Sequence, residues 1–198
     1  MKRYLTDINL WFLLGINIWS LLYYQAHPND FNSVVWLYWG QSVLIGLFNF
    51  VDLLTIPAPP IDGKLPQYFF KSKGCSALFF LCHYQFFHLV YAVFLVSGKR
   101  LDMHFILSAL AFYAFNLGIQ FYQHKKAQSH EAPDIGKMFF LPYLRIIPMH
   151  LMILLPAFFH VTPSIVFLFL KTLADIIMYL ITSPVYRVQT SPVTKEVR

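Results

Sequence analysis

Three residues that could bind a metal ion lie in apolar parts of the sequence. His83, His150 and Asp175 each fall in a stretch long enough to cross a bilayer. Ionisable side chains at that depth are costly, and they usually face the protein interior, pair with one another or take part in chemistry. Two imidazoles and a carboxylate suit a divalent ion such as Zn²⁺, whose open position would polarise a bound water. The three residues therefore predict a metal site in the membrane, with a hydrolytic reaction as its chemistry.

Two cationic residues in the same stretches are candidate catalytic groups. Lys171 and Arg145 could stabilise a developing oxyanion or bind an anionic headgroup. Each also has a simpler interpretation. Lys171 and Asp175 are four residues apart and could form an ion pair on one helix, and Arg145 could extend its side chain to the lipid headgroups. Both interpretations stay open at this point.

Helical spacing extends the site to other polar residues. Positions four, seven or eight apart lie near one face of a helix. His88 is five residues from His83, so we expect it on another side, as a packing or hydrogen-bonding residue. The spacing predicts a shared polar core that adds five residues to the metal ligands: Gln41, Asn49, Tyr91, Asn116 and Tyr179.

The composition shows which elements must hold these residues. The chain has 198 residues, of which 58% are hydrophobic and 12% charged, and its mean hydropathy is +0.55. This is far more apolar than a soluble domain. We expect a single all-α domain, a six-helix transmembrane bundle, with residues 183–198 as a flexible cytoplasmic tail. Six apolar stretches are near the length of about 20 residues that a bilayer requires, namely residues 8–24, 34–54, 76–96, 103–122, 139–159 and 164–182.

The charged residues predict the partner and the orientation. The net charge of +6 comes from residues scattered between the apolar stretches, without a basic stripe, so the expected partner is the lipid bilayer and not nucleic acid. Lys99 and Arg100 alone occupy the loops expected on one side, whereas the other loops and both termini carry most of the Lys and Arg residues. The positive-inside rule then predicts a multi-pass protein of the cell membrane with both termini in the cytoplasm.

Four segments together resemble a known family. They are YWGQSVLIGLFNF (38–50), FFLCHYQFFHLVYAVF (79–94), PYLRIIPMH (142–150) and LKTLAD (170–175). The ordered set is similar to a bacterial and archaeal family of six-helix membrane proteins catalogued as domain of unknown function 6498. The resemblance implies a shared fold and polar core but no established activity. The family pattern has Glu at Gln41 and His at Tyr91 and Tyr179, and it matches at His83, Arg145, His150, Lys171 and Asp175.

Three classes of function fit these residues. The metal site, which we favour from the sequence, would make the protein a membrane-embedded enzyme. Alternatively, His83, His150 and Asp175 could be relay sites in a pathway for a small solute or protons. The third class is a non-catalytic membrane subunit or scaffold, in which the polar core serves helix packing only. As a cofactor, a haem with His83 and His150 as axial ligands is a variant of the first class.

Overall fold

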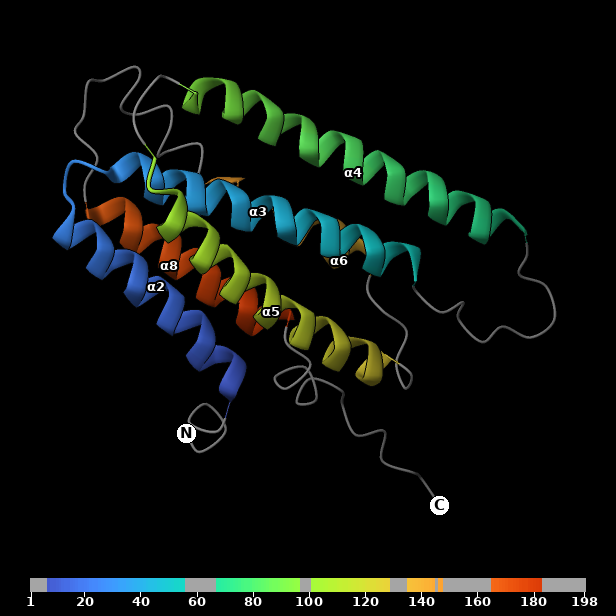
Figure 1. Ribbon diagram of the computed structural model, residues 1–198. Helices are drawn as coiled ribbons and strands as arrows, with labels where there is room; N and C mark the ends of the chain where they lie inside the picture. The colour runs from blue at the N-terminus through green and yellow to red at the C-terminus, as the bar shows by residue number, and fades with distance from the viewer. Residues whose placement is uncertain are drawn as a thin grey trace.

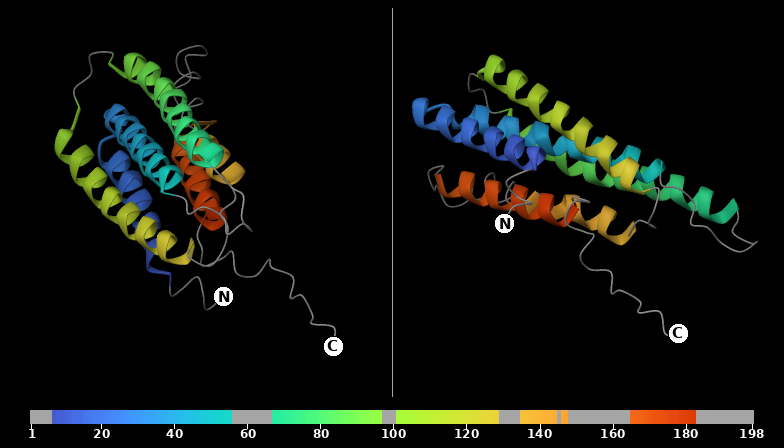
Figure 2. Two further views of the ribbon diagram at one scale, coloured as in Figure 1. Left: turned by 90° about the vertical axis from the view of Figure 1, so that its right-hand side faces the viewer. Right: turned by 90° about the horizontal axis from the view of Figure 1, so that it is seen from below.

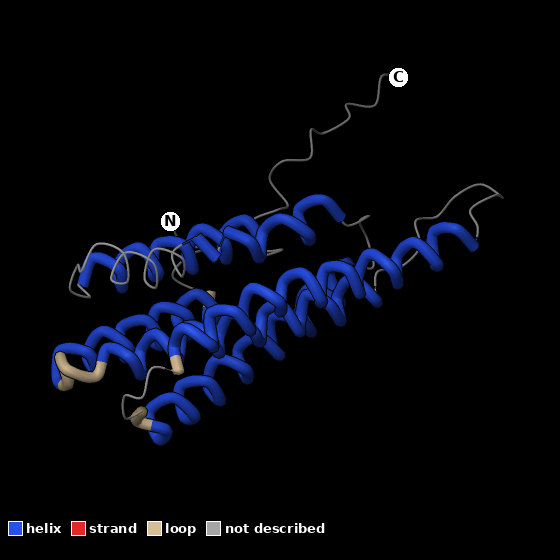
Figure 3. The backbone as a smooth tube through the Cα atoms, turned by 90° about the horizontal axis from the view of Figure 1, so that it is seen from above, coloured by secondary structure: helices blue, strands red, loops and turns tan. Residues whose placement is uncertain are grey.

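The protein is all-helical in the part of the chain that the structure describes. The structure is a computed structural model that describes residues 7–55, 67–96, 101–128, 135–144, 146–147 and 165–182. These ranges contain no strand (Figure 3), which confirms the predicted fold class. Their six helices are α2 (Ile8–Ala26), α3 (Phe31–Leu54), α4 (Gln67–Leu95), α5 (Met103–Gln128), α6 (Ile135–Leu144) and α8 (Ile165–Thr182).

Three helices are long and apolar enough to cross a membrane. They cover Phe31–Leu54, Gly74–Leu95 and Met103–Lys126, and they indicate that this is a membrane protein. Two more expected spans, residues 8–24 and 164–182, coincide with α2 and α8, which are not among these three. The span expected at 139–159 begins in α6 and continues outside the described residues. The membrane crossing of these segments and the orientation of the termini stay predictions.

The helices form a bundle around α3. α2, α3, α4, α5 and α8 run nearly side by side, with α4 on one side of α3 and α2 and α5 on the other (Figures 1 and 2). α3 contacts α2, α4, α5 and α6, and α8 packs against α2 and α6. The beginning of α2 and the end of α8 lie at the same end of the bundle, because Tyr179 near the end of α8 bonds Asp7 directly before α2.

A hydrophobic cluster joins α2, α3, α5 and α8. This inner cluster lies beside the polar residues described below and consists of Leu13 and Ile16 of α2, Tyr113 of α5 and Tyr179 of α8, with Leu44 and Ile45 of α3 packed against them. Large apolar side chains also cover the outer surface: Phe79, Leu89 and Val93 of α4 are 63%, 64% and 70% exposed. Exposed apolar surface of this extent suits contact with lipid better than contact with water.

Close packing of α3 on α4 depends on a glycine. A Cβ atom at Gly46 would lie 2.6 Å from the ring carbons Cδ1 and Cε1 of Tyr84. Without a side chain at Gly46, the fully buried ring of Tyr84 fits against α3, and its hydroxyl lies 2.8 Å from Ser42 Oγ. Small residues at a helix contact are the usual way in which membrane helices approach closely.

Hydrogen bonds tie the α2–α3 turn to the start of α5. The Tyr23 hydroxyl donates to Asp30 and, at 3.1 Å, to Asp102 Oδ2. Asp102 caps α5: its Oδ1 accepts the Phe105 N–H at 3.0 Å, and its own N–H donates to Ser33 Oγ at 2.9 Å. The bond from Phe105, assisted by that from Tyr23, holds the pKa of the Asp102 carboxyl below its ordinary value. The ionised carboxylate thus fixes this end of the bundle.

Candidate intramembrane polar site

A buried ion pair on α8 forms the centre of the candidate site. Lys171 Nζ lies 3.1 Å from Asp175 Oδ2 and donates a second hydrogen bond, of 2.7 Å, to Asn17 Oδ1 of α2. Asn17 Nδ2 donates to the same Asp175 oxygen at 3.3 Å, so the three side chains bond one another in a ring. Lys171, Asp175 and Asn17 are 1%, 4% and 5% exposed. Charges buried this deeply persist only with such pairing and hydrogen bonding.

Local sequence places these three side chains. Lys171 and Asp175 are four residues apart and therefore share one face of α8. Asn17 follows Leu13 by one turn of α2 and donates to its carbonyl at 2.9 Å, which holds the amide toward the interior. From α3, the ring of the fully buried Tyr38 lies 5.0 Å from Lys171 Nζ, a cation–π distance. The ion pair is thus enclosed by residues of α2, α3 and α8.

A second polar contact lies one turn further along α8. The Tyr179 hydroxyl lies 2.8 Å from each carboxylate oxygen of Asp7. Asp7 also caps α2, since its Oδ1 accepts the N–H groups of Asn9 and Leu10 at 3.1 and 3.3 Å. Asn9 Nδ2 in turn donates to Gln123 Oε1 of α5 at 2.6 Å. Asp7 and Tyr179 are 7% and 5% exposed, so this contact is also inside the protein.

The same end of the bundle carries charged residues. Asp52 near the end of α3 pairs with Lys125 Nζ of α5 at 2.5 Å and with His124 Nδ1 at 3.1 Å. These partners follow Gln123, the residue that bonds Asn9. Polar and charged groups therefore collect where α2 begins and where α3 and α5 end.

Two amide side chains of the described helices are almost completely buried. Gln41 of α3 and Asn116 of α5 are 0% and 1% exposed, and no group within the described ranges lies at hydrogen-bond distance from the oxygen or nitrogen of either amide. Buried polar groups without protein partners are uncommon, and they commonly bond water or a ligand. These are two of the residues that helical spacing predicts for the polar core.

Residues one turn away on the same helices place these amides near the inner cluster. Asn116 follows Tyr113 by three residues, and Gln41 precedes Leu44 by three; both neighbours belong to the inner cluster. Asn17 and Asp175 stand four residues from Leu13 and Tyr179 of the same cluster. Residues three or four apart share a helix face. The two amides, Asn17 and Asp175 therefore each stand about one turn from a residue of the inner cluster on their own helix.

The two histidines of α4 occupy different environments. His83 is exposed, and its Nδ1 lies 2.7 Å from the Tyr143 hydroxyl of α6. His88 is 1% exposed, its Nδ1 lies 2.8 Å from the Tyr84 carbonyl oxygen, and its own carbonyl accepts the Trp39 indole N–H at 2.7 Å. His88 thus belongs to the interface of α3 and α4 as a packing and hydrogen-bonding residue.

Four predicted site residues remain to be placed, two of them in the described helices α3 and α4. Tyr91 is 4% exposed and has the His88 ring at a centroid distance of 6.2 Å. Asn49 is half-buried in α3. His150 and Arg145 lie outside the described residues, so the meeting of His83, His150 and Asp175 stays a prediction.

The described residues do not form a metal site. Within the ranges given above, no group of three or more His, Cys, Asp and Glu side chains is placed to hold a metal ion. The Asp175 oxygen that bonds Asn17 also faces the Lys171 ammonium. A divalent cation at that oxygen would be repelled by the ammonium. The arrangement is better suited to exchanging a proton between the two groups than to binding a metal.

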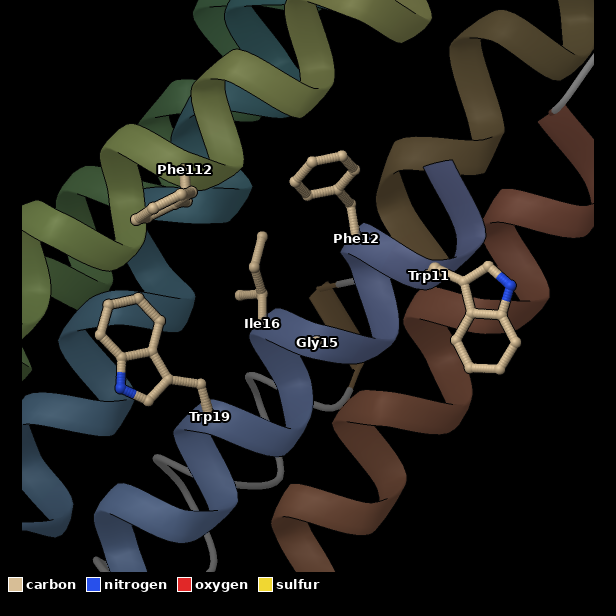
Figure 4. Close-up of a pocket in the computed structure, with 6 residues that line it drawn as sticks. All are labelled: Trp11, Phe12, Gly15, Ile16, Trp19 and Phe112. Carbon is tan, nitrogen blue, oxygen red and sulfur yellow. The ribbon is translucent and has the colours of Figure 1, made fainter. Parts of the chain in front are cut away.

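An apolar groove on the outside of the bundle is a separate feature. It lies between α2 and α5 and is lined by Trp11, Phe12, Gly15, Ile16, Trp19 and Phe112 (Figure 4). Trp19 stands edge-on to Phe112, with ring centroids 6.0 Å apart. None of the six described lining residues is ionisable, in contrast to the buried ion pair on α8.

The main contributor that the sequence analysis missed is α2. Asn9, Asn17 and Ser20 are buried polar residues of this helix, and Asn17 completes the ring around Lys171. The signal was the eight-residue spacing of Asn9 and Asn17, the same spacing that relates Gln41 to Asn49. That spacing places both asparagines near one face of α2.

Comparison with known proteins identifies the family. The model of the family of unknown function DUF6498 matches residues 1–190, so the chain belongs to this family, as the four segments suggested. No protein with a curated description and no solved structure matches the chain. Membership assigns no activity, and the function must be argued from the site.

Proposed function

We propose that this member of the DUF6498 family is a multi-pass protein of the cell membrane that provides a pathway for protons or a small polar solute. The observation that carries the proposal is the burial of the Lys171–Asp175 pair inside the bundle, 1% and 4% exposed. Ionisable groups at such depth commonly mark ion or proton routes. In the proposed pathway, the pair is the ionisable element.

The chemistry of the pair supports this function. Moving one proton from the Lys171 ammonium to the Asp175 carboxylate, across 3.1 Å, leaves two neutral groups. The desolvation cost of the charged pair offsets part of the cost of that transfer. Asn17 can serve both states, because its amide has one oxygen that accepts and one nitrogen that donates.

The proposal is tested by measuring flux into vesicles. Purified protein is reconstituted, and the entry of protons is followed with a trapped pH-sensitive dye. The entry of acetate, ammonium, glycerol and urea is followed by light scattering. We expect wild-type vesicles to admit at least one of these probes faster than protein-free vesicles do. The double variant Lys171→Met with Asp175→Leu should lose that flux, because it removes both ionisable groups while keeping the site electrically neutral.

The matched control is Lys126→Met, which removes an exposed lysine near the end of α5 and should leave the flux unchanged. If the folded double variant passes every probe as fast as the wild type, the ion pair only holds helices together and the proposal is wrong. A stoichiometric metal in the purified wild type that is lost in His83→Ala would instead support the metal site predicted from the sequence.

A further inference from the structure

The Lys171–Asp175 ion pair and the hydrogen bond of Tyr179 to Asp7 lie along one face of α8. Lys171, Asp175 and Tyr179 are spaced by four residues and share a helix face. The first two are bonded to each other, and the third is bonded to Asp7. Between Asp175 and Tyr179 the helix rises by about 6 Å. One water molecule can link two side chains across a separation of this kind.

Asn116 of α5 stands about one helical turn from the inner cluster that includes Tyr179. It is three residues from Tyr113, which belongs to the same cluster as Tyr179. Its side chain is 1% exposed, and neither amide atom has a hydrogen-bond partner in the described part of the chain. An amide that offers both a donor and an acceptor inside the protein is suited to hold water.

We propose that Asn116 holds water that connects the Lys171–Asp175 pair to Tyr179 and Asp7, so that the transported species is the proton. This inference rests on the proposed function and names its substrate and its route. The route ends where α2 begins, at the end of the bundle that also carries Asp52, His124 and Lys125.

Each step along this route moves one proton from a donor group to an acceptor group. Lys171 gives one proton to the Asp175 carboxylate, which becomes neutral. The Asp175 carboxyl passes a proton to the water at Asn116, and that water passes one to the Tyr179 hydroxyl. Tyr179 then gives its own proton to the Asp7 carboxylate, to which it is already bonded at 2.8 Å. Asp7 releases the proton at the end of the bundle, and Lys171 takes up the next one from the opposite side.

Two variants test the route in the same vesicle assay, one at the Tyr179 hydroxyl and one at the Asn116 amide. Tyr179→Phe removes the relay hydroxyl, and Asn116→Leu removes the group that holds water while keeping a similar volume. Each should lower the rate of proton entry by about tenfold or more, as expected when a proton-transferring group is lost. Asn116→Ser keeps a donor and an acceptor and leaves room for water, so it should retain the flux.

Tyr84→Phe is the matched control for Tyr179→Phe. It removes a hydroxyl from a fully buried tyrosine of α4 that bonds Ser42, away from the route, and should leave the flux unchanged. If the folded Tyr179→Phe and Asn116→Leu proteins conduct protons as the wild type does, while Lys171→Met with Asp175→Leu does not, the route is wrong and the pathway stands. If the wild type admits acetate, ammonium, glycerol or urea but no protons, the transported species is not the proton and this inference is wrong.

Discussion

Lys171 and Asp175 neutralise each other inside the protein, so removing one charge leaves the other buried without its counter-ion. We expect Lys171→Met to lower the free energy of unfolding by on the order of 3 kcal/mol. Lys171→Met with Asp175→Leu should recover most of that loss, because no uncompensated charge remains. The measurement is unfolding by titration with dodecyl sulfate, followed by circular dichroism. A double variant as unstable as Lys171→Met would show that hydrogen bonding to Asn17, and not charge balance, dominates.

The ion pair also shows which contacts of a residue can be predicted from the sequence alone. Its spacing of four residues offered the contact between Lys171 and Asp175 as one of two interpretations of the sequence, because that geometry is local to one helix. The contact with Asn17 joins residues 154 positions apart in the sequence. Helical spacing places a residue on a face of its own helix, but it does not say which other helix that face meets. The partner on α2 therefore had to come from the structure.

At the scale of helices, Gly46 controls how closely α3 approaches α4. Gly46→Ala would place its Cβ 2.6 Å from the Tyr84 ring, which is fully buried and bonded to Ser42. We expect a loss of about 1–3 kcal/mol in the free energy of unfolding, the usual cost of overpacking. The matched control is Gly15→Ala on the exposed face of α2, where no neighbouring group of the described structure lies within 4 Å of the new Cβ.

The same titration with dodecyl sulfate measures both glycine variants. Gly15→Ala should be neutral or more stable by up to about 1 kcal/mol, because alanine favours the helix. Equal stability of the two variants would mean that α4 moves away from α3 without cost. In that case the contact of Tyr84 with α3 does not hold the two helices together.

The helices themselves could be located from the sequence more readily than their faces. Apolar length placed α3, α4 and α5 because a bilayer requires a continuous apolar stretch. The sequence analysis placed both His83 and Tyr91 in the predicted site, eight residues apart, yet His83 is exposed and Tyr91 is buried. Eight residues turn a helix by about 80° away from alignment. That angle matters in α4, which lies at the side of the bundle (Figure 1) and is covered on part of its surface only.

At the scale of the whole molecule, the orientation in the membrane decides where the proposed route would release protons. Asn29, in the turn before α3, and Thr55, directly after it, are both exposed and lie at opposite ends of a 24-residue helix. Lys64, Lys71 and Lys73 follow Thr55, so the positive-inside rule predicts Thr55 in the cytoplasm and Asn29 outside. Asp52, one turn before Thr55, pairs with Lys125 of α5, and Asn9 of α2 bonds Gln123 two residues before that lysine. The same rule therefore predicts the start of α2 at the cytoplasmic end as well.

Cysteine labelling in intact cells tests this orientation. The background is Cys75→Ser with Cys82→Ser, because both native cysteines are free and exposed. A maleimide that does not cross membranes should label Asn29→Cys in intact cells and Thr55→Cys only after permeabilisation. Labelling of both sites in intact cells would contradict a membrane-spanning α3. The reverse pattern would keep α3 in the membrane but place Asp7 and Tyr179 at the outer surface, so that the proposed route would release protons outside the cell.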